Sequence, residues 1–80
     1  MKTEQRVAER IKETRKEKKL TQSKVSLLTG IDQSEISKIE RGKRLPGLNQ
    51  LAKLAKLFET SMDYLAGLTD VTDRYPEKEN

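Results

Sequence analysis

Residues 20–42 read LTQSKVSLLTGIDQSEISKIERG, and this stretch decides the fold. It predicts two short helices, over residues 22–29 and about 33–41, with a turn between them. Thr21 is a candidate N-cap for the first helix because its hydroxyl can accept a hydrogen bond from a free backbone N–H. Gly30 stands where a helix commonly ends in a left-handed residue. Two short helices joined by a glycine-containing turn are typical of a helix-turn-helix unit.

Packing within such a unit places demands on individual positions, and the sequence meets them. The two helices cross closely, so one position of the first helix must be small, and Ser26 fits. Ile36 and Ile39 are three residues apart and therefore share one face of the second helix. We expect them to face inward, with Val25 and Ile31 completing the local core.

The start of the second helix carries a possible capping pattern. Asp32 is a good N-cap, and Glu35 follows three residues later, so residues 32–35 resemble a capping box with Asp in place of Ser or Thr. We therefore expect Asp32 and Glu35 to bind each other's backbone N–H groups. Gly42 then ends the helix.

Outside this stretch the same helical spacing continues on both sides. Residues 3–18 contain no Gly or Pro, and an apolar face there is formed by Val7, Ala8 and Ile11. A fourth helix is predicted over about 48–59, and its inward stripe is Leu51, Leu54, Ala55 and Phe58. A fifth begins after the candidate cap Ser61, with Met62 and Leu65 inward and Gly67 at its end. The expected fold class is all-α, a compact five-helix domain.

Charge is unevenly distributed along the 80 residues, whose net charge is +4. Residues 1–60 carry 15 Lys/Arg against 8 Asp/Glu, a net of +7, whereas residues 61–80 carry 2 against 5, a net of −3. A basic body favours an anionic partner, although ordinary solubilising charge would look the same. We expect one folded domain at 1–68, with the helix-turn-helix at about 22–41, and an acidic, flexible tail at 69–80.

Several functional classes are disfavoured by what the sequence lacks. It has no Cys and no His, which removes thiolate chemistry, the commonest general base and the commonest metal ligand. It has no glycine-rich phosphate loop, no signal peptide and no apolar run of membrane length. We therefore expect no enzyme activity, no cofactor, metal or small-molecule ligand and no membrane partner. The expected location is cytoplasmic and nucleoid-associated, for a protein encoded by a bacterium or a phage.

Taken together, the spaced residues resemble the Xre-type branch of the lambda repressor and Cro helix-turn-helix family. The resemblance covers about residues 6–67 and rests on Leu20-Thr21-Gln22, Val25, Gly30-Ile31, Gln33-Ser34, Ile36-Ser37, Ile39-Glu40-Arg41-Gly42-Lys43-Arg44, Pro46, Leu48, Leu51, Leu54-Ala55 and Phe58. Agreement across two helices, a turn and the following loop and helix makes the match specific. Ser26 departs from the usual alanine, and we expect its hydroxyl to bond a carbonyl one turn back.

The resemblance implies that the helix at 33–41 enters the major groove of DNA with its first turn against the base edges. Carried over by position, the base-contacting residues are Gln33, Ser34, Lys38 and Ser37. Glutamine can bond adenine through N6 and N7, and serine can serve several bases. The same comparison gives the residues that contact the DNA backbone, which are Gln22, Arg41, Lys43, Arg44 and Arg10.

The roles predicted for the acidic residues Glu40 and Glu35 each have an alternative. In the family, the positions of Arg15 and Glu40 form an arginine–carboxylate bridge that orients the recognition helix. The alternative is two exposed charges that contribute little. Glu35 either caps its own helix or accepts a hydrogen bond from cytosine N4. The cap is favoured, since phosphates repel a free carboxylate.

Members of this family usually bind palindromic DNA as symmetric homodimers, with half-sites about 34 Å apart. We expect the dimer surface at the fifth helix and the segment just after it, including Tyr64, Leu68 and Val71. The implied function is a transcriptional regulator, a repressor of phage, mobile-element or restriction-control type. The alternative is an antitoxin or adaptor on the same fold, which docks a protein through Leu27, Leu28 or the acidic tail. Loss of binding in a Gln33→Ala/Lys43→Ala double variant would favour DNA as the partner.

Overall fold

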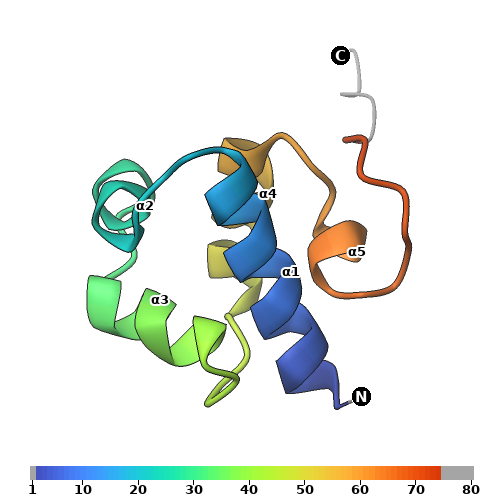
Figure 1. The fold of residues 1–80 in the computed structure, drawn as a ribbon, viewed down its shortest axis with the longest axis horizontal. Coiled ribbons are helices and arrows are strands. Elements are labelled where there is room, and N and C mark those ends of the chain that lie inside the picture. Colours follow the sequence, from blue (N-terminus) through green and yellow to red (C-terminus); the bar gives the residue numbers. More distant parts are fainter. Residues whose placement is uncertain (1, 75–80) are drawn as a thin grey trace.

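The structure is a computed structural model that describes residues 2–74, and its helices follow the predicted order (Figure 1). There are five of them, namely α1 (Thr3–Glu17), α2 (Gln22–Thr29), α3 (Gln33–Glu40), α4 (Leu48–Phe58) and α5 (Met62–Leu65). No strand occurs within the described residues. The predicted all-α, five-helix architecture is confirmed, and the helix limits differ from the expected ones by about one residue.

Helix ends are fixed by local hydrogen bonds of the predicted kind at two places. The hydroxyl of Thr21 accepts from the backbone N–H of Lys24 at 3.0 Å, and the hydroxyl of Ser61 accepts from that of Tyr64 at 2.9 Å. Gly30 follows α2 with φ +76°, a left-handed conformation in which a side chain would be strained. These contacts confirm the predicted starts of α2 and α5 and the predicted end of α2.

The capping box predicted at the start of α3 is wrong. Asp32 occupies the N-cap position but makes no side-chain cap hydrogen bond. The carboxylate of Glu35 pairs instead with Arg44 and, at 3.9 Å, with Lys38. Arg44 comes from the loop that follows α3, so its proximity depends on the tertiary fold and not on the local pattern of residues 32–35.

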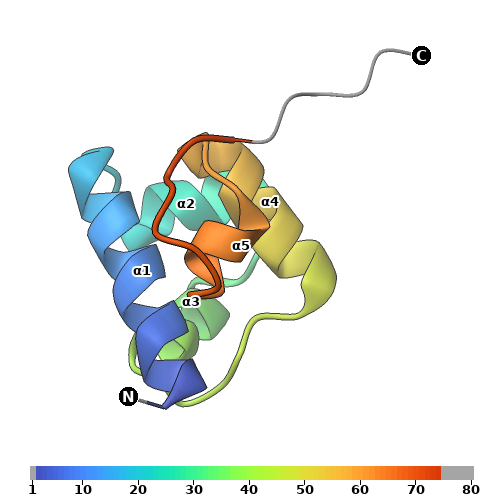
Figure 2. The same ribbon diagram turned by 90° about the vertical axis from the view of Figure 1, so that its right-hand side faces the viewer.

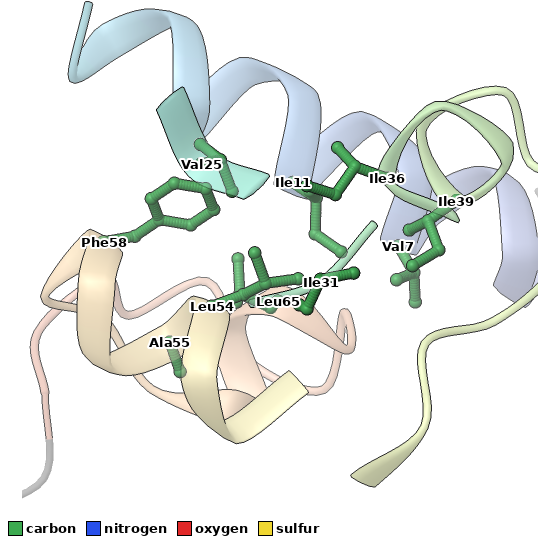
Figure 3. Packing of buried hydrophobic residues seen from close by; sticks show 10 residues of the cluster. All are labelled: Val7, Ile11, Val25, Ile31, Ile36, Ile39, Leu54, Ala55, Phe58 and Leu65. Atoms are coloured by element: carbon green, nitrogen blue, oxygen red, sulfur yellow. The ribbon is translucent and has the colours of Figure 1, made fainter. Parts of the chain in front are cut away.

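The core lies where the inner faces of all five helices meet (Figure 3). Ile11 of α1, Ile36 of α3 and Phe58 of α4 are each 1% exposed. Burying a side chain of this size stabilises a fold by about 1.5–3 kcal/mol. The other buried members of the cluster are Val7, Val25, Ile31, Ile39, Leu54, Ala55 and Leu65. The predicted inward stripes are therefore largely confirmed, with Leu51 and Met62 partly buried at the margin.

Residues after α5 turn back and run alongside that helix (Figure 2). The hydroxyl of Thr60 donates to the carbonyl of Thr72 at 2.6 Å. Arg10 of α1 donates to the carbonyl of Thr69 at 2.9 Å and to the carboxylate of Asp70 at 2.8 Å. The described part of the predicted tail thus contacts the body, while its remainder, 75–80, lies outside the described residues. The division into domains at 1–68 and 69–80 stays a prediction.

Candidate nucleic-acid interface

Helix α3 has one buried face and one exposed face. Ile36 and Ile39 are each 1% exposed and pack into the core. Gln33, Ser34 and Lys38 are exposed, and all three side chains belong to the outer face. Ser37 and Glu35 are partly buried at the edge between the two faces. The structure therefore brings the predicted base-contacting residues together on one accessible surface.

The turn between α2 and α3 is built from the glycine and two hydroxyl residues. The N–H of Gly30 donates to the carbonyl of Ser26 at 2.9 Å. Thr29 donates its hydroxyl to the carbonyl of Val25 at 2.7 Å and accepts from the N–H of Ile31 at 3.2 Å. The hydrogen bond expected from the Ser26 hydroxyl to a carbonyl one turn back is wrong, since among the described residues it is Thr29 of α2 that makes such a bond. Ser26 is partly buried and supplies the small side chain.

A paired arginine and glutamate hold α3 against α1. Arg15 donates from Nε to Oε2 of Glu40 at 2.7 Å and from Nη2 to Oε1 at 2.9 Å. The two side chains are 11% and 3% exposed. The hydrogen bond to Glu40, with its negative charge, raises the pKa of Arg15 above its usual value. This bidentate geometry fits the bridge implied by the resemblance, and its burial excludes the alternative of two exposed charges.

The same glutamate reaches α2. Glu40 Oε1 accepts a second hydrogen bond, from Nε2 of Gln22 at 3.2 Å, and Arg15 also donates to the carbonyl of Leu20 at 2.8 Å. The buried pair therefore orients the side chain of Gln22, a residue predicted to contact the DNA backbone. Gln22 is the first residue of α2, where free N–H groups and the helix dipole favour an anion. The network fixes α1, α2 and α3 relative to one another.

The basic residues after α3 differ in how they are engaged. Arg44 donates to Glu35, and its Nη2 donates to Oε1 of Gln50 at 3.1 Å. A phosphate would have to compete with those partners. Lys43 is exposed and its ammonium makes no ion pair within residues 2–74. Arg41 is exposed, and within residues 2–74 its side chain donates to the carbonyl of Ser37 at 3.3 Å and forms no ion pair. Unlike Arg44, Lys43 and Arg41 therefore have no carboxylate partner with which a phosphate would have to compete.

The structure does not bring Arg10 together with the other residues predicted to contact the DNA backbone. Its guanidinium donates to the carbonyl of Tyr64 at 3.1 Å and lies over the Tyr64 ring, 4.1 Å from the centroid. With the bonds to Thr69 and Asp70 described above, its donors are committed to the α5 side of the molecule. We assign Arg10 to holding that side together. The sequence carried no signal of this role beyond the acidic character of the tail.

Two further findings concern other kinds of site. Within the described residues, no group of three or more acidic, His or Cys side chains is placed to hold a metal ion. None of the helices there is long and apolar enough to cross a membrane.

Comparisons with known proteins agree with this geometry. A family model described as helix-turn-helix, HTH_3, matches residues 11–65. The uncharacterized HTH-type transcriptional regulator YobD of Bacillus subtilis (strain 168) is 36% identical over 72 residues, which are 90% of this chain and 64% of YobD. The chain thus spans less than two thirds of that relative.

Two solved structures share the fold. The restriction-modification controller protein C.AhdI from Aeromonas hydrophila has a TM-score of 0.73 and 31% identity, covering 78% of this chain and 94% of its own. An HTH_3 family transcriptional regulator from Vibrio cholerae has a TM-score of 0.73 and 28% identity, covering 81% of this chain and 36% of its own. The likeness therefore extends over nearly all of one neighbour and about a third of the other.

Proposed function

Since the chain belongs to the HTH_3 helix-turn-helix family, we propose that it is a transcriptional regulator that binds double-stranded DNA sequence-specifically, with α3 in the major groove. The exposed outer face of α3 is the observation that carries this proposal. Gln33, Ser34 and Lys38 are polar, accessible and side by side, while the opposite face is buried. An α-helix of this kind fits the major groove, which presents a distinct donor and acceptor pattern for each base pair.

Each residue of this face has a role that its chemistry suits. Gln33 can donate to and accept from adenine, and Ser34 and Ser37 can hydrogen-bond several bases. Lys38 can donate to guanine O6 and N7. Glu35 pairs with Arg44 and does not act as the helix cap that the sequence favoured. We assign it to positioning the loop after α3.

Backbone contacts would fix the register of α3 without reading sequence. Gln22 at the start of α2 and the accessible cations Arg41 and Lys43 flank α3 and supply these contacts. Arg44 joins them if a phosphate replaces its present partners. Charge-assisted contacts of this type make binding strongly dependent on salt.

The regulator would act as a homodimer on a palindromic operator and repress transcription by occupying it. Leu68 and Val71 are 77% and 62% exposed, next to α5, and apolar surface of this kind favours association. The likeness to C.AhdI, a restriction-modification controller, supports a restriction-control role, within the group of phage, mobile-element and restriction regulators.

Selection from a random pool of duplex DNA tests the proposal. We expect a palindrome whose half-sites are about one helical turn apart, and an affinity that falls steeply as salt rises. Recovery of a single half-site would keep the DNA-binding function and overturn the symmetric dimer. No enrichment over random DNA would overturn sequence-specific binding.

Replacing Lys43 by alanine should weaken binding to selected and random DNA by a similar factor. The reason is that a phosphate contact contributes affinity without sequence information. The slope of log affinity against log salt should become shallower by about 1. Fluorescence anisotropy at several salt concentrations measures both quantities. Lys12→Ala is the matched control, because Lys12 is an exposed lysine of α1 and should leave the slope unchanged. An unaltered slope in the Lys43 variant would remove this residue from the interface.

A further inference from the structure

An open groove lies between α2 and α4, on a surface to which neither DNA binding nor the expected dimer contact assigns a role. Its lining is Leu28, Thr29, Lys53, Lys56 and Leu57, and we call it the α2–α4 groove. It offers about 390 Å³ of space, the share of on the order of a dozen water molecules in the liquid. An occupant could therefore displace a substantial amount of water.

The floor and outer edge of this groove are apolar and accessible. Leu28 is 51% exposed, and its neighbour Leu27 on α2 is 75% exposed. Single exposed leucines are ordinary on a protein surface. Leu28 and Leu57, however, line the same groove from two different helices, and apolar surface gathered in a groove marks a site of interaction.

The rim of the groove is basic. Lys53 and Lys56 line it from α4, and Lys24 lies one turn before Leu28 on the same face of α2. Among the described residues that line the groove there is no carboxylate. An apolar floor with lysines on both sides complements a segment that carries apolar residues on one face and acidic residues beside them.

We infer that the α2–α4 groove is the docking site for an acidic amphipathic helix of a partner protein. Such a helix would place apolar side chains at i, i+3 or i+4, and i+7 against Leu28 and Leu57, as helices bound in grooves commonly do. Its Asp or Glu side chains would pair with Lys53 and Lys56. A second copy docked by two-fold symmetry would set lysines against lysines, and DNA would leave the leucines uncovered.

The groove and the outer face of α3 are separate surfaces. Leu28 lies in the last turn of α2 and precedes Gln33 by five residues in the chain. The inference does not depend on the proposed DNA contacts, because the groove residues are distinct from the outer face of α3. Operator binding and partner docking can therefore fail separately.

The test uses the full chain as bait for an unbiased library of displayed peptides about four helical turns long. Counter-selection is done on a Leu28→Ser variant. We expect the enriched peptides to carry acidic residues and apolar residues at helical spacing. Backbone amide spectra of the labelled protein, titrated with the best synthetic peptide, should shift at the groove residues and little elsewhere.

Matched variants measure the contributions of the floor and the rim. Leu28→Ser should weaken the peptide by about tenfold or more, as expected for a central apolar anchor. Lys53→Gln/Lys56→Gln should weaken it by a similar factor and make its salt dependence shallower, because the two charges that attract the acidic peptide are removed. Leu48→Ser, at a residue of α4 that is 74% exposed and does not line the groove, should leave the affinity unchanged. All variants should keep the helical circular dichroism of the parent.

Several results would overturn the inference. These are the absence of enrichment over the Leu28→Ser variant, enriched peptides that are neutral or basic, or amide shifts outside the groove. Shifts at the groove that depend on protein concentration alone would assign it to a second copy. Shifts produced by duplex DNA would assign it to phosphate. Normal operator binding by Leu28→Ser would show that the proposed DNA function stands in any of these cases.

Discussion

Replacing Glu40 by alanine should lower the free energy of unfolding by about 3–5 kcal/mol, the usual cost of breaking a buried ion pair by removing one partner. Glu40 is 3% exposed at its side chain and receives three hydrogen bonds, two from Arg15 and one from Gln22. Its loss leaves the guanidinium of Arg15 buried with one remaining acceptor, the carbonyl of Leu20. Since native proteins have only about 5–15 kcal/mol of stability, this loss removes a large fraction of the total.

Urea denaturation followed by circular dichroism measures this effect. Glu35→Ala is the matched control, because Glu35 also pairs with an arginine but on the surface, where an ion pair contributes about 0–1 kcal/mol. A double variant, Arg15→Met/Glu40→Leu, should recover much of the loss, since it removes both charges together. If Glu40→Ala unfolded at the same urea concentration as the control, the buried pair would not stabilise the position of α3.

Replacing Gln33 by alanine should weaken operator binding by about 1–3 kcal/mol, or roughly 5- to 150-fold, and should relax the preference at one base pair of each half-site. Gln33 is exposed in the first turn of α3, so its truncation should leave the urea midpoint unchanged. The amide would lose its hydrogen bonds to a base edge, and those bonds differ from one base pair to another.

Two measurements separate this role from that of a phosphate contact. The salt slope of Gln33→Ala should match that of the parent, in contrast to the shallower slope expected of Lys43→Ala. A repeated selection with the variant should return a site degenerate at the contacted position. A uniform loss of affinity for every sequence would instead place Gln33 at the DNA backbone.

Most of the fold was predictable because its signals are local. Thr21, Gly30 and Ser61 act within one helical turn of their own positions, and the apolar stripes repeat at helical spacing. The bridge between Arg15 and Glu40 came only from the family resemblance. Nothing local joins two residues that are 25 apart in the chain.

The partners of Glu35 and Arg10 depend instead on the tertiary fold. Asp32 and Glu35 have capping spacing, but Arg44 reaches the carboxylate from the next loop and a charged partner competes well with a backbone N–H. Arg10 looks like any surface cation of α1, and its partners lie 54 to 60 residues further along the chain. Their proximity depends on how α1 packs against α5, which no local pattern encodes.

The long separation between Arg10 and its partners also orders events during synthesis. A ribosome adding about 5–20 residues per second needs several seconds to pass from Arg10 to Asp70. During that interval the nascent chain contains the residues of α1, α2 and α3 but not yet those of α5, so the contacts with α5 cannot form. Leu65 and the acceptors of Arg10 are the last of these residues to be synthesised, so α1 can gain its contacts with α5 only after residue 70 has been added.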